Sequence, residues 1–212
     1  MKRICVTNRK LCQNDFFMQI ENICMYENIY ALILREKDLD DKKYKEFALK
    51  CNDICKKNNV LFFINSKINI AEKLDIKNIQ ISFKDFIENK ERLNKFDNIA
   101  VSVHSLEEAK IAEGNFRGSE GQKIGRSEMT TTNDKTMYNK SLKFLIVGHI
   151  FQTDCKKGLE PKGTEFLKEI CDNVSLPVFA IGGINEKTIN KLNGITIEGI
   201  CMMSNLMQKT YK

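Results

Sequence analysis

Both histidines of the chain follow short apolar runs, and they are the side chains best suited to moving a proton. His149 follows a run that begins at Phe144, and His104 follows another run. The loop after His149 carries Thr153 and Lys156. An imidazole titrates near neutral pH, so it transfers a proton in either direction without a cofactor. This pattern predicts acid/base chemistry on an anionic substrate, with His149 the stronger candidate and His104 the weaker one.

Basic and amide side chains occupy the same place after other apolar runs. Arg35 and Lys37 come directly after the strongly apolar Ala31–Leu34, and Asn65 ends the run Val60–Asn65. Acidic residues are few at these positions. We therefore expect Arg35, Lys37 and Asn65 to bind an anionic ligand.

The elements that position these residues are eight apolar runs separated by helical segments. The runs are Ile4–Thr7, Ile29–Leu34, Val60–Asn65, Asn78–Ser82, Ile99–Val103, Phe144–Gly148, Pro177–Gly182 and Ile197–Met203. Runs this short and continuously apolar suit strands that are buried on both faces of a parallel sheet. The predicted helices are Asp41–Asn58, Ser105–Glu113, Gly163–Asp172 and Asn185–Leu192.

Local signals support two of these helix starts. Ser105 is expected to be an N-cap, with Glu108 closing a capping box, and Asn185 is expected to be another N-cap. In 212 residues, eight strands alternating with helices predict a single α/β domain over residues 1–212, a (β/α)8 TIM barrel. A doubly wound open sheet is the alternative.

One stretch does not fit the alternation. Residues 113–140, between the fifth and sixth runs, are rich in Gly, Ser, Thr and Asn and poor in large apolar residues. We predict a polar, mobile loop insertion there.

Two glycine-containing segments near the end of the chain predict a phosphate site. Gly182 and Gly183 end the seventh run, and Met203 and Ser204 end the eighth. Glycine lets the backbone approach a ligand, and a helix that starts there offers free N–H groups to an anion. The loops after strands seven and eight are the usual phosphate site of barrels. The alternative, that these glycines serve only turns, stays open.

Composition argues against several other classes of function. The net charge of +6 comes from lysines interleaved with acids, which is typical of solvated helix faces, so we expect no nucleic-acid partner. No apolar run approaches the roughly 20 residues that span a membrane, and the N-terminus lacks a signal peptide, so we expect a cytoplasmic protein with no membrane partner. The eight cysteines lack zinc-binding spacing; we expect reduced thiols and no metal.

Several of these motifs occur together in one known superfamily. They are Arg35-Glu36-Lys37, Ile64-Asn65, Thr153-x-x-Lys156, Ala180-Ile-Gly-Gly-Ile184 and Gly199-x-x-x-Met203-Ser204. In order and spacing they resemble the thiamine phosphate synthase/TenI superfamily over nearly the whole chain. The resemblance implies a TIM barrel that binds a thiazole phosphate, a small-molecule partner.

Two segments resemble the TenI branch of this superfamily, whose members are thiazole tautomerases. They are Ser102-Val-His-Ser-Leu-Glu-Glu-Ala109 and Gly148–Glu160. The resemblance implies that the chain aromatises a 2-carboxythiazole phosphate tautomer by a proton shift. His149 matches the proton-transfer histidine of that branch. Such a shift needs one general acid/base and no cofactor.

Two alternatives stay open. Thiamine phosphate synthases use Mg²⁺ and a pyrimidine pyrophosphate, and their pattern has Gln at the position of Ile33 and Asp at that of Ser66. Asp85 matches a second metal ligand of the synthases only loosely. The other alternative is a non-catalytic, regulatory protein that binds a thiazole phosphate. Related barrels commonly form small oligomers, so a homo-oligomer is also left open.

Overall fold

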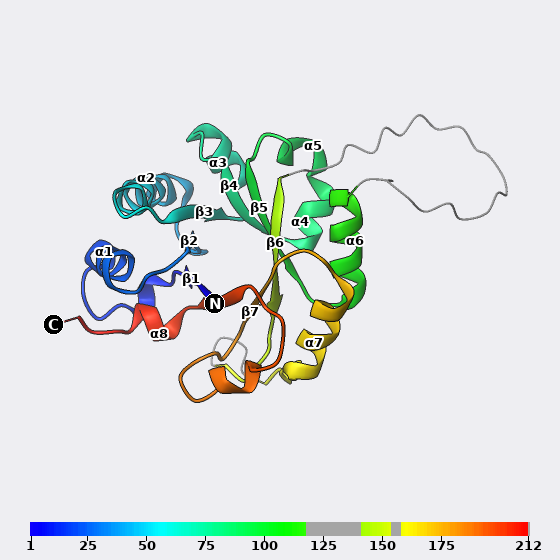
Figure 1. The fold of residues 1–212 in the computed structure, drawn as a ribbon. Helices are drawn as coiled ribbons and strands as arrows, with labels where there is room; N and C mark the ends of the chain where they lie inside the picture. Colours follow the sequence, from blue (N-terminus) through cyan, green and yellow to red (C-terminus); the bar gives the residue numbers. More distant parts are fainter. Residues whose placement is uncertain (118–140, 154–157, 212) are drawn as a thin grey trace.

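Eight parallel strands pair in sequence order and close into a barrel, with helices around the outside (Figure 1). The structure is a computed structural model that describes residues 1–117, 141–153 and 158–211. The strands are β1 (Lys2–Val6), β2 (Ala31–Leu34), β3 (Leu61–Asn65), β4 (Asn78–Ser82), β5 (Asn98–Val103), β6 (Leu142–Gly148), β7 (Val178–Ile181) and β8 (Gly199–Met202). The predicted TIM barrel is confirmed, and the open sheet is excluded because β1 pairs with β8.

The strands are apolar on both faces because each face meets a different core. In β1, Ile4 and Val6 point into the barrel, whereas Cys5 joins the layer between strands and helices. In β6, Phe144 and Ile146 belong to the inner cluster. This alternation follows from the two-residue period of a strand, and it explains why the runs read as continuously apolar.

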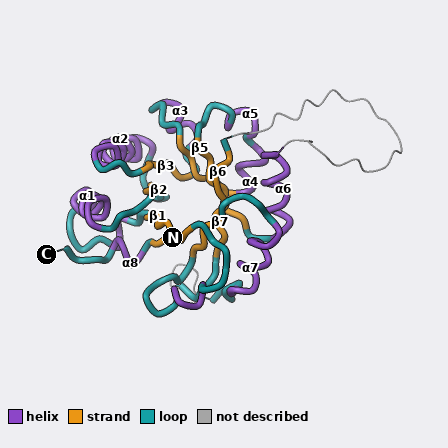
Figure 2. Tube along the Cα trace, in the orientation of Figure 1, coloured by secondary structure: helices purple, strands orange, loops and turns teal. Residues whose placement is uncertain are grey.

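Helices cover the outside of the barrel (Figure 2). They are α1 (Phe16–Tyr26), α2 (Asp41–Lys57), α3 (Ile68–Lys73), α4 (Phe83–Glu88), α5 (Lys90–Leu93), α6 (Leu106–Arg117), α7 (Gly163–Asn173) and α8 (Ser204–Met207), with the 3₁₀ turns η1 (Arg9–Leu11) and η3 (Ile189–Leu192). Cys51 and Cys55 are fully buried on one face of α2. The cysteines in the described part of the chain are free thiols, as predicted; Cys155 lies outside it.

One predicted helix and its N-cap are corrected. The helix predicted over Asn185–Leu192 is absent, and only η3 forms there. Asn185 Oδ1 accepts from Lys187 N at 2.9 Å, and Asn185 N donates to Thr188 Oγ1 at 2.9 Å. These local bonds replace helical ones, which is how Asn and Thr compete with helix formation. Asn185 therefore caps a turn and not a helix.

The start of α6 agrees with the sequence pattern in part. Ser105 Oγ accepts from Glu108 N at 3.0 Å, as predicted for an N-cap. The Glu108 carboxylate, however, accepts from His104 N at 2.6 Å. The helix continues to Arg117, so the first residues of the predicted 113–140 loop are helical; residues 118–140 lie outside the described part.

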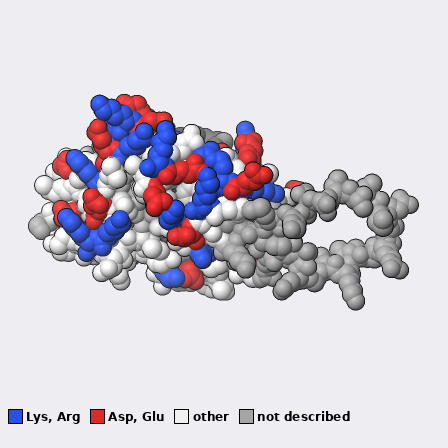
Figure 3. Space-filling model, turned by 90° about the horizontal axis from the view of Figure 1, so that it is seen from above, with Lys and Arg blue, Asp and Glu red and all other residues white. Residues whose placement is uncertain are grey.

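The described surface carries mixed charges. On the face shown in Figure 3, Lys and Arg side chains lie beside Asp and Glu side chains, as the interleaved sequence pattern predicted. Within residues 1–117, 141–153 and 158–211, no helix has the length and apolar character needed to cross a membrane.

Closure of the barrel predicts one sensitive glycine. A Cβ at Gly199 would collide with the Lys2 carbonyl oxygen and the Phe179 ring, and the Lys2 backbone is fixed by pairing with β8. We expect Gly199→Ala to lower the free energy of unfolding by about 3 kcal/mol, as for an overpacked core. Urea unfolding followed by circular dichroism measures this. Gly114→Ala is the matched control, because a Cβ there meets nothing within 4 Å; an equal loss in both variants would contradict the prediction.

Candidate active site

The carboxyl ends of the strands surround a cavity of about 610 Å³. Its floor is apolar and includes Val6, Ile33, Ile146 and Cys201 from the barrel interior. Burial raises the pKa of the Cys201 thiol well above its ordinary value. Because the thiolate is the reactive form, Cys201 is an inert part of the floor and not a nucleophile.

The structure places nearly all of the predicted site residues in the wall of this one cavity. They are Arg35, Lys37, Asn65, His104, His149, Thr153, Gly182, Gly183, Met203 and Ser204. They come from six different strand ends, which parallel pairing brings to the same rim. Lys156 falls within 154–157, outside the described residues.

His149 is held from two sides and is 4% exposed. Its carbonyl oxygen accepts from Lys162 N at 2.8 Å, just before α7. The next residue, Ile150, donates its N–H to Ile181 O of β7 at 3.1 Å. The backbone of His149 is thus fixed between β7 and α7, and its imidazole lines the cavity in a largely water-excluded place.

His104 lies at the neighbouring strand end, next to the backbone of His149. Its Nδ1 is 3.4 Å from the carbonyl oxygen of Gly148, and its own carbonyl oxygen accepts from Lys162 Nζ. Its side chain is exposed, in contrast to the buried His149. Both imidazoles therefore line the cavity at the β5–β6 edge, in different environments.

The glycines after β7 are required by close packing against the loop after β6. Gly182 has φ +109°, and a Cβ there would lie 3.1 Å from His149 Cα. Gly183 has φ +65°, and a Cβ there would lie 2.8 Å from Phe151 O. The Gly-Gly pair therefore also allows the loop that carries His149 to pack closely against β7, a role that the sequence did not reveal.

Backbone N–H groups remain available at the two predicted phosphate-binding loops. In the described part of the chain, the N–H groups of Gly183 and Ser204 donate no hydrogen bond. Ser204 begins the short helix α8, where the first N–H groups have no intrahelical acceptor. No helix begins directly after Gly183, so at that loop the predicted helix N-terminus is replaced by a turn.

A row of uncharged polar side chains crosses three strand ends. Asn65 Nδ2 donates to Gln80 Oε1 at 2.6 Å, and Gln80 Nε2 donates to Ser102 Oγ at 2.9 Å. All three line the cavity. Sequence reasoning missed Gln80 and Ser102, although the alternation Asn78-Ile-Gln-Ile-Ser82 placed polar residues on one face of β4.

The described lining of the cavity carries positive charge. Arg35 and Lys37 line it, and among the described residues no hydrogen bond or ion pair engages the Arg35 guanidinium or the Lys37 amine. No Asp or Glu is found among the described residues of the lining. Two cations with no partner among the described residues, in a concave site, attract an anionic ligand.

The sequence matches a known family over two overlapping segments. The sequence model described as "Thiamine monophosphate synthase" covers residues 4–118 and 114–206. This chain belongs to that family. The two segments overlap at residues 114–118, at the start of the predicted 113–140 insertion.

Curated relatives align with this chain over nearly its whole length. A thiamine-phosphate synthase of Clostridium acetobutylicum is 31% identical over 97% of this chain and 87% of its own length. One from Clostridium tetani is 32% identical over 96% and 87%. A solved thiamine phosphate pyrophosphorylase from Pyrococcus furiosus has a TM-score of 0.75 at 24% identity, covering 98% of this chain and 88% of that one; it supports the fold alone. The relatives' names match the synthase alternative and not the tautomerase.

The polar row predicts a cost for removing its central residue. Gln80→Leu leaves the Asn65 amide and the Ser102 hydroxyl without their shared partner, so we expect the free energy of unfolding to fall by about 1–3 kcal/mol. Urea denaturation measures it. Asn78→Leu is the comparison variant: it breaks a similar pair of hydrogen bonds, to Phe62 O and from Asn98, at the other end of β4 and outside the cavity. A Gln80→Leu protein as stable as wild type would show that the row contributes nothing.

Proposed function

We propose that the chain is a thiazole tautomerase of thiamine biosynthesis, which aromatises a 2-carboxythiazole phosphate tautomer. The observation that carries this proposal is a buried imidazole, His149, in a cavity with two cations and no carboxylate among its described lining residues. A proton shift on a doubly anionic ligand needs an acid/base group and counter-charges, and no other reactive group. The superfamily resemblance of Gly148–Glu160 points to the same chemistry.

His149 acts as the general acid/base. It accepts a proton from one position of the thiazole tautomer as neutral imidazole, and it returns a proton to the other position as imidazolium. The ligand is isomerised with no net gain or loss of protons or electrons. Hydrogen bonds from Lys162 N and to Ile181 O fix the backbone that carries the ring, and a positioned side chain is the geometric requirement for such transfer.

The two ends of the ligand have separate anchors. The N–H groups of Gly183 and Ser204 bind the phosphate, together with Gly182 and Met203 as parts of the same loops. Arg35, Lys37 and Lys156 bind the carboxylate, while Asn65 and Thr153 contact the uncharged part. A guanidinium suits a carboxylate because it donates two parallel hydrogen bonds. The anchors hold the ring between them, beside His149.

Thiamine-phosphate synthase is the second candidate, and the names of the relatives favour it. That reaction is associated in the superfamily with Mg²⁺. The residues present do not fit this ion: Ser66 offers only a neutral hydroxyl, and Asp85 accepts from Ser82 Oγ at 2.7 Å and is not part of the cavity wall. Mg²⁺ prefers carboxylate oxygens, and no cluster of three or more His, Cys, Asp or Glu residues occurs within the described residues.

The first test is turnover of the tautomer to the aromatic carboxythiazole phosphate. We expect His149→Gln to lower kcat by about 10²–10⁴-fold, the usual contribution of a general acid/base, with little change in thermal unfolding. His104→Gln should lower it far less. Equal rates for wild type and His149→Gln would contradict the assigned role. Binding without turnover by wild type would instead support a non-catalytic, regulatory protein.

The second test separates the two enzymes. We expect the wild type to form no thiamine phosphate from a thiazole phosphate and the pyrimidine pyrophosphate at any Mg²⁺ concentration, because the cavity lacks the carboxylates for the ion. Ser66→Asp is the informative variant, because it places at this position the carboxylate that the synthase pattern has. Ser66 has φ +58°, a conformation that Asp tolerates comparatively well. Mg²⁺-dependent product formation by the wild type would establish the synthase and remove the tautomerase proposal.

A further inference from the structure

Glu36 lies between Arg35 and Lys37 in the sequence, but unlike them it does not face the cavity. Arg35 and Lys37 line the cavity, whereas Glu36 is absent from the lining and is only 2% exposed. Neighbouring side chains of an extended segment point to opposite sides, so residues 35 and 37 share one side and residue 36 takes the other. Backbone geometry alone thus turns Glu36 away, but it does not hold the carboxylate there.

The Glu36 carboxylate is held by the segment after β1. Its Oε1 accepts from Thr7 Oγ1 at 2.7 Å and from Arg9 N at 2.9 Å. Its Oε2 accepts from Arg9 Nη1 at 3.1 Å. Arg9 is the cation that neutralises this buried charge.

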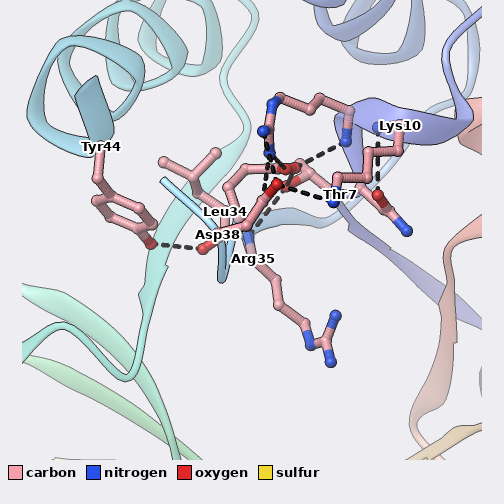
Figure 4. Close-up of polar contacts among 9 residues, drawn as sticks. Thr7, Lys10, Leu34, Arg35, Asp38 and Tyr44 are labelled. Carbon is pink, nitrogen blue, oxygen red and sulfur yellow. Dashed lines mark hydrogen bonds and ion pairs between the residues drawn. The ribbon is translucent and has the colours of Figure 1, made fainter. Parts of the chain in front are cut away.

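Arg9 is itself fixed at the surface. Its Nη2 donates to Asp38 Oδ2 at 2.8 Å, and Lys10 Nζ lies 2.9 Å from the same oxygen. The hydrogen bond from Arg9 holds the pKa of Asp38 well below its usual range, so Asp38 stays ionised at neutral pH. Figure 4 shows Lys10, Thr7 and Asp38 gathered on one side of the β2 end, while the Arg35 side chain extends away from them.

The same contacts fix the backbone that carries Arg35. Arg35 N donates to Thr7 Oγ1 at 3.0 Å. On the other side, Tyr44 OH of α2 donates to Leu34 O at 2.6 Å (Figure 4). The Thr7 hydroxyl therefore contacts two consecutive residues: it accepts a hydrogen bond from the Arg35 backbone N–H and donates one to the Glu36 carboxylate.

We propose that Arg9 is a positioning residue: by holding Glu36, it prevents this carboxylate from pairing with Arg35 or Lys37 and so keeps both cations open to the ligand's anionic groups. Without Arg9, Glu36 Oε2 would be a buried charge with no cation, and such a charge turns toward the nearest one. Arg35 and Lys37 are its neighbours in the chain. The inference rests on the proposed function for one point, the identity of the ligand as a carboxylated thiazole phosphate.

Four variants separate this role from a merely structural one. Arg9→Met releases Glu36, and Arg9→Met combined with Glu36→Gln removes the released charge. Glu36→Gln alone keeps an oxygen acceptor for Thr7 and Arg9 N. Lys10→Met is the matched control, because it also removes one positive charge from the Asp38 cluster but does not touch Glu36. Arg9→Gln, which also removes the cation, is the milder substitute should Arg9→Met not fold.

The first readout requires no ligand. Phenylglyoxal modifies arginines that are not ion-paired, and mass spectrometry of the Arg35 peptide measures its rate. We expect the rate in Arg9→Met to fall several-fold and to return to the wild-type value in the double variant. Lys10→Met and Glu36→Gln should match wild type. An unchanged rate in Arg9→Met, or no recovery in the double variant, would overturn the proposal.

The second readout is calorimetric binding of 2-carboxythiazole phosphate. Arg9→Met should raise Kd roughly tenfold, as for loss of a hydrogen bond between charged groups, and the double variant should recover most of it. The same thiazole phosphate without the carboxylate should be affected less. If wild type binds neither compound, the proposed function fails, while the phenylglyoxal rates still decide whether Arg9 keeps Glu36 away from Arg35.

Discussion

Parallel pairing of all eight strands forces their carboxyl ends to one rim, and the site depends on this constraint. Residues as distant in sequence as Arg35 and Ser204 meet in one cavity only because the sheet closes between β1 and β8. Closure also requires both faces of each strand to be buried. The inner face then supplies the apolar floor of the cavity, and the polar residues at the strand ends supply its wall.

The positive character of the cavity arises from the placement of acids as well as from the presence of bases. Within the described part of the chain, Glu36, Asp85 and Glu108 follow strand ends closely, and each is bound by a local donor. Glu36 accepts from Thr7 and Arg9, Asp85 from Ser82, and Glu108 from the backbone N–H of His104. None is in the described lining. Since these three acids have local donors, they do not neutralise Arg35 and Lys37.

The sequence predicted what local patterns determine and missed what depends on partners. The strands were found because continuous apolar runs can be buried only in such a sheet. The row through Gln80 was missed because its partners, Asn65 and Ser102, belong to other strands. The prediction of a helix starting at Asn185 was wrong because the side chains of Asn185 and Thr188 form hydrogen bonds with the nearby backbone. Gly183 was expected to approach a ligand, yet its contact with the 151–152 loop cannot be seen in the sequence.

Similarity over the whole chain and the identity of the reaction depend on different residues. The barrel, the loops proposed to bind phosphate and Arg35 suit any ligand with a thiazole phosphate and a second anionic group, so a chain can resemble the synthases throughout and still differ from them in its reaction. The proposed reaction depends on a few positions at the rim. Ser66 stands at the position where the synthase pattern has Asp, and His149 is the proposed acid/base. Because a fold supports several chemistries, these positions carry more weight than overall identity.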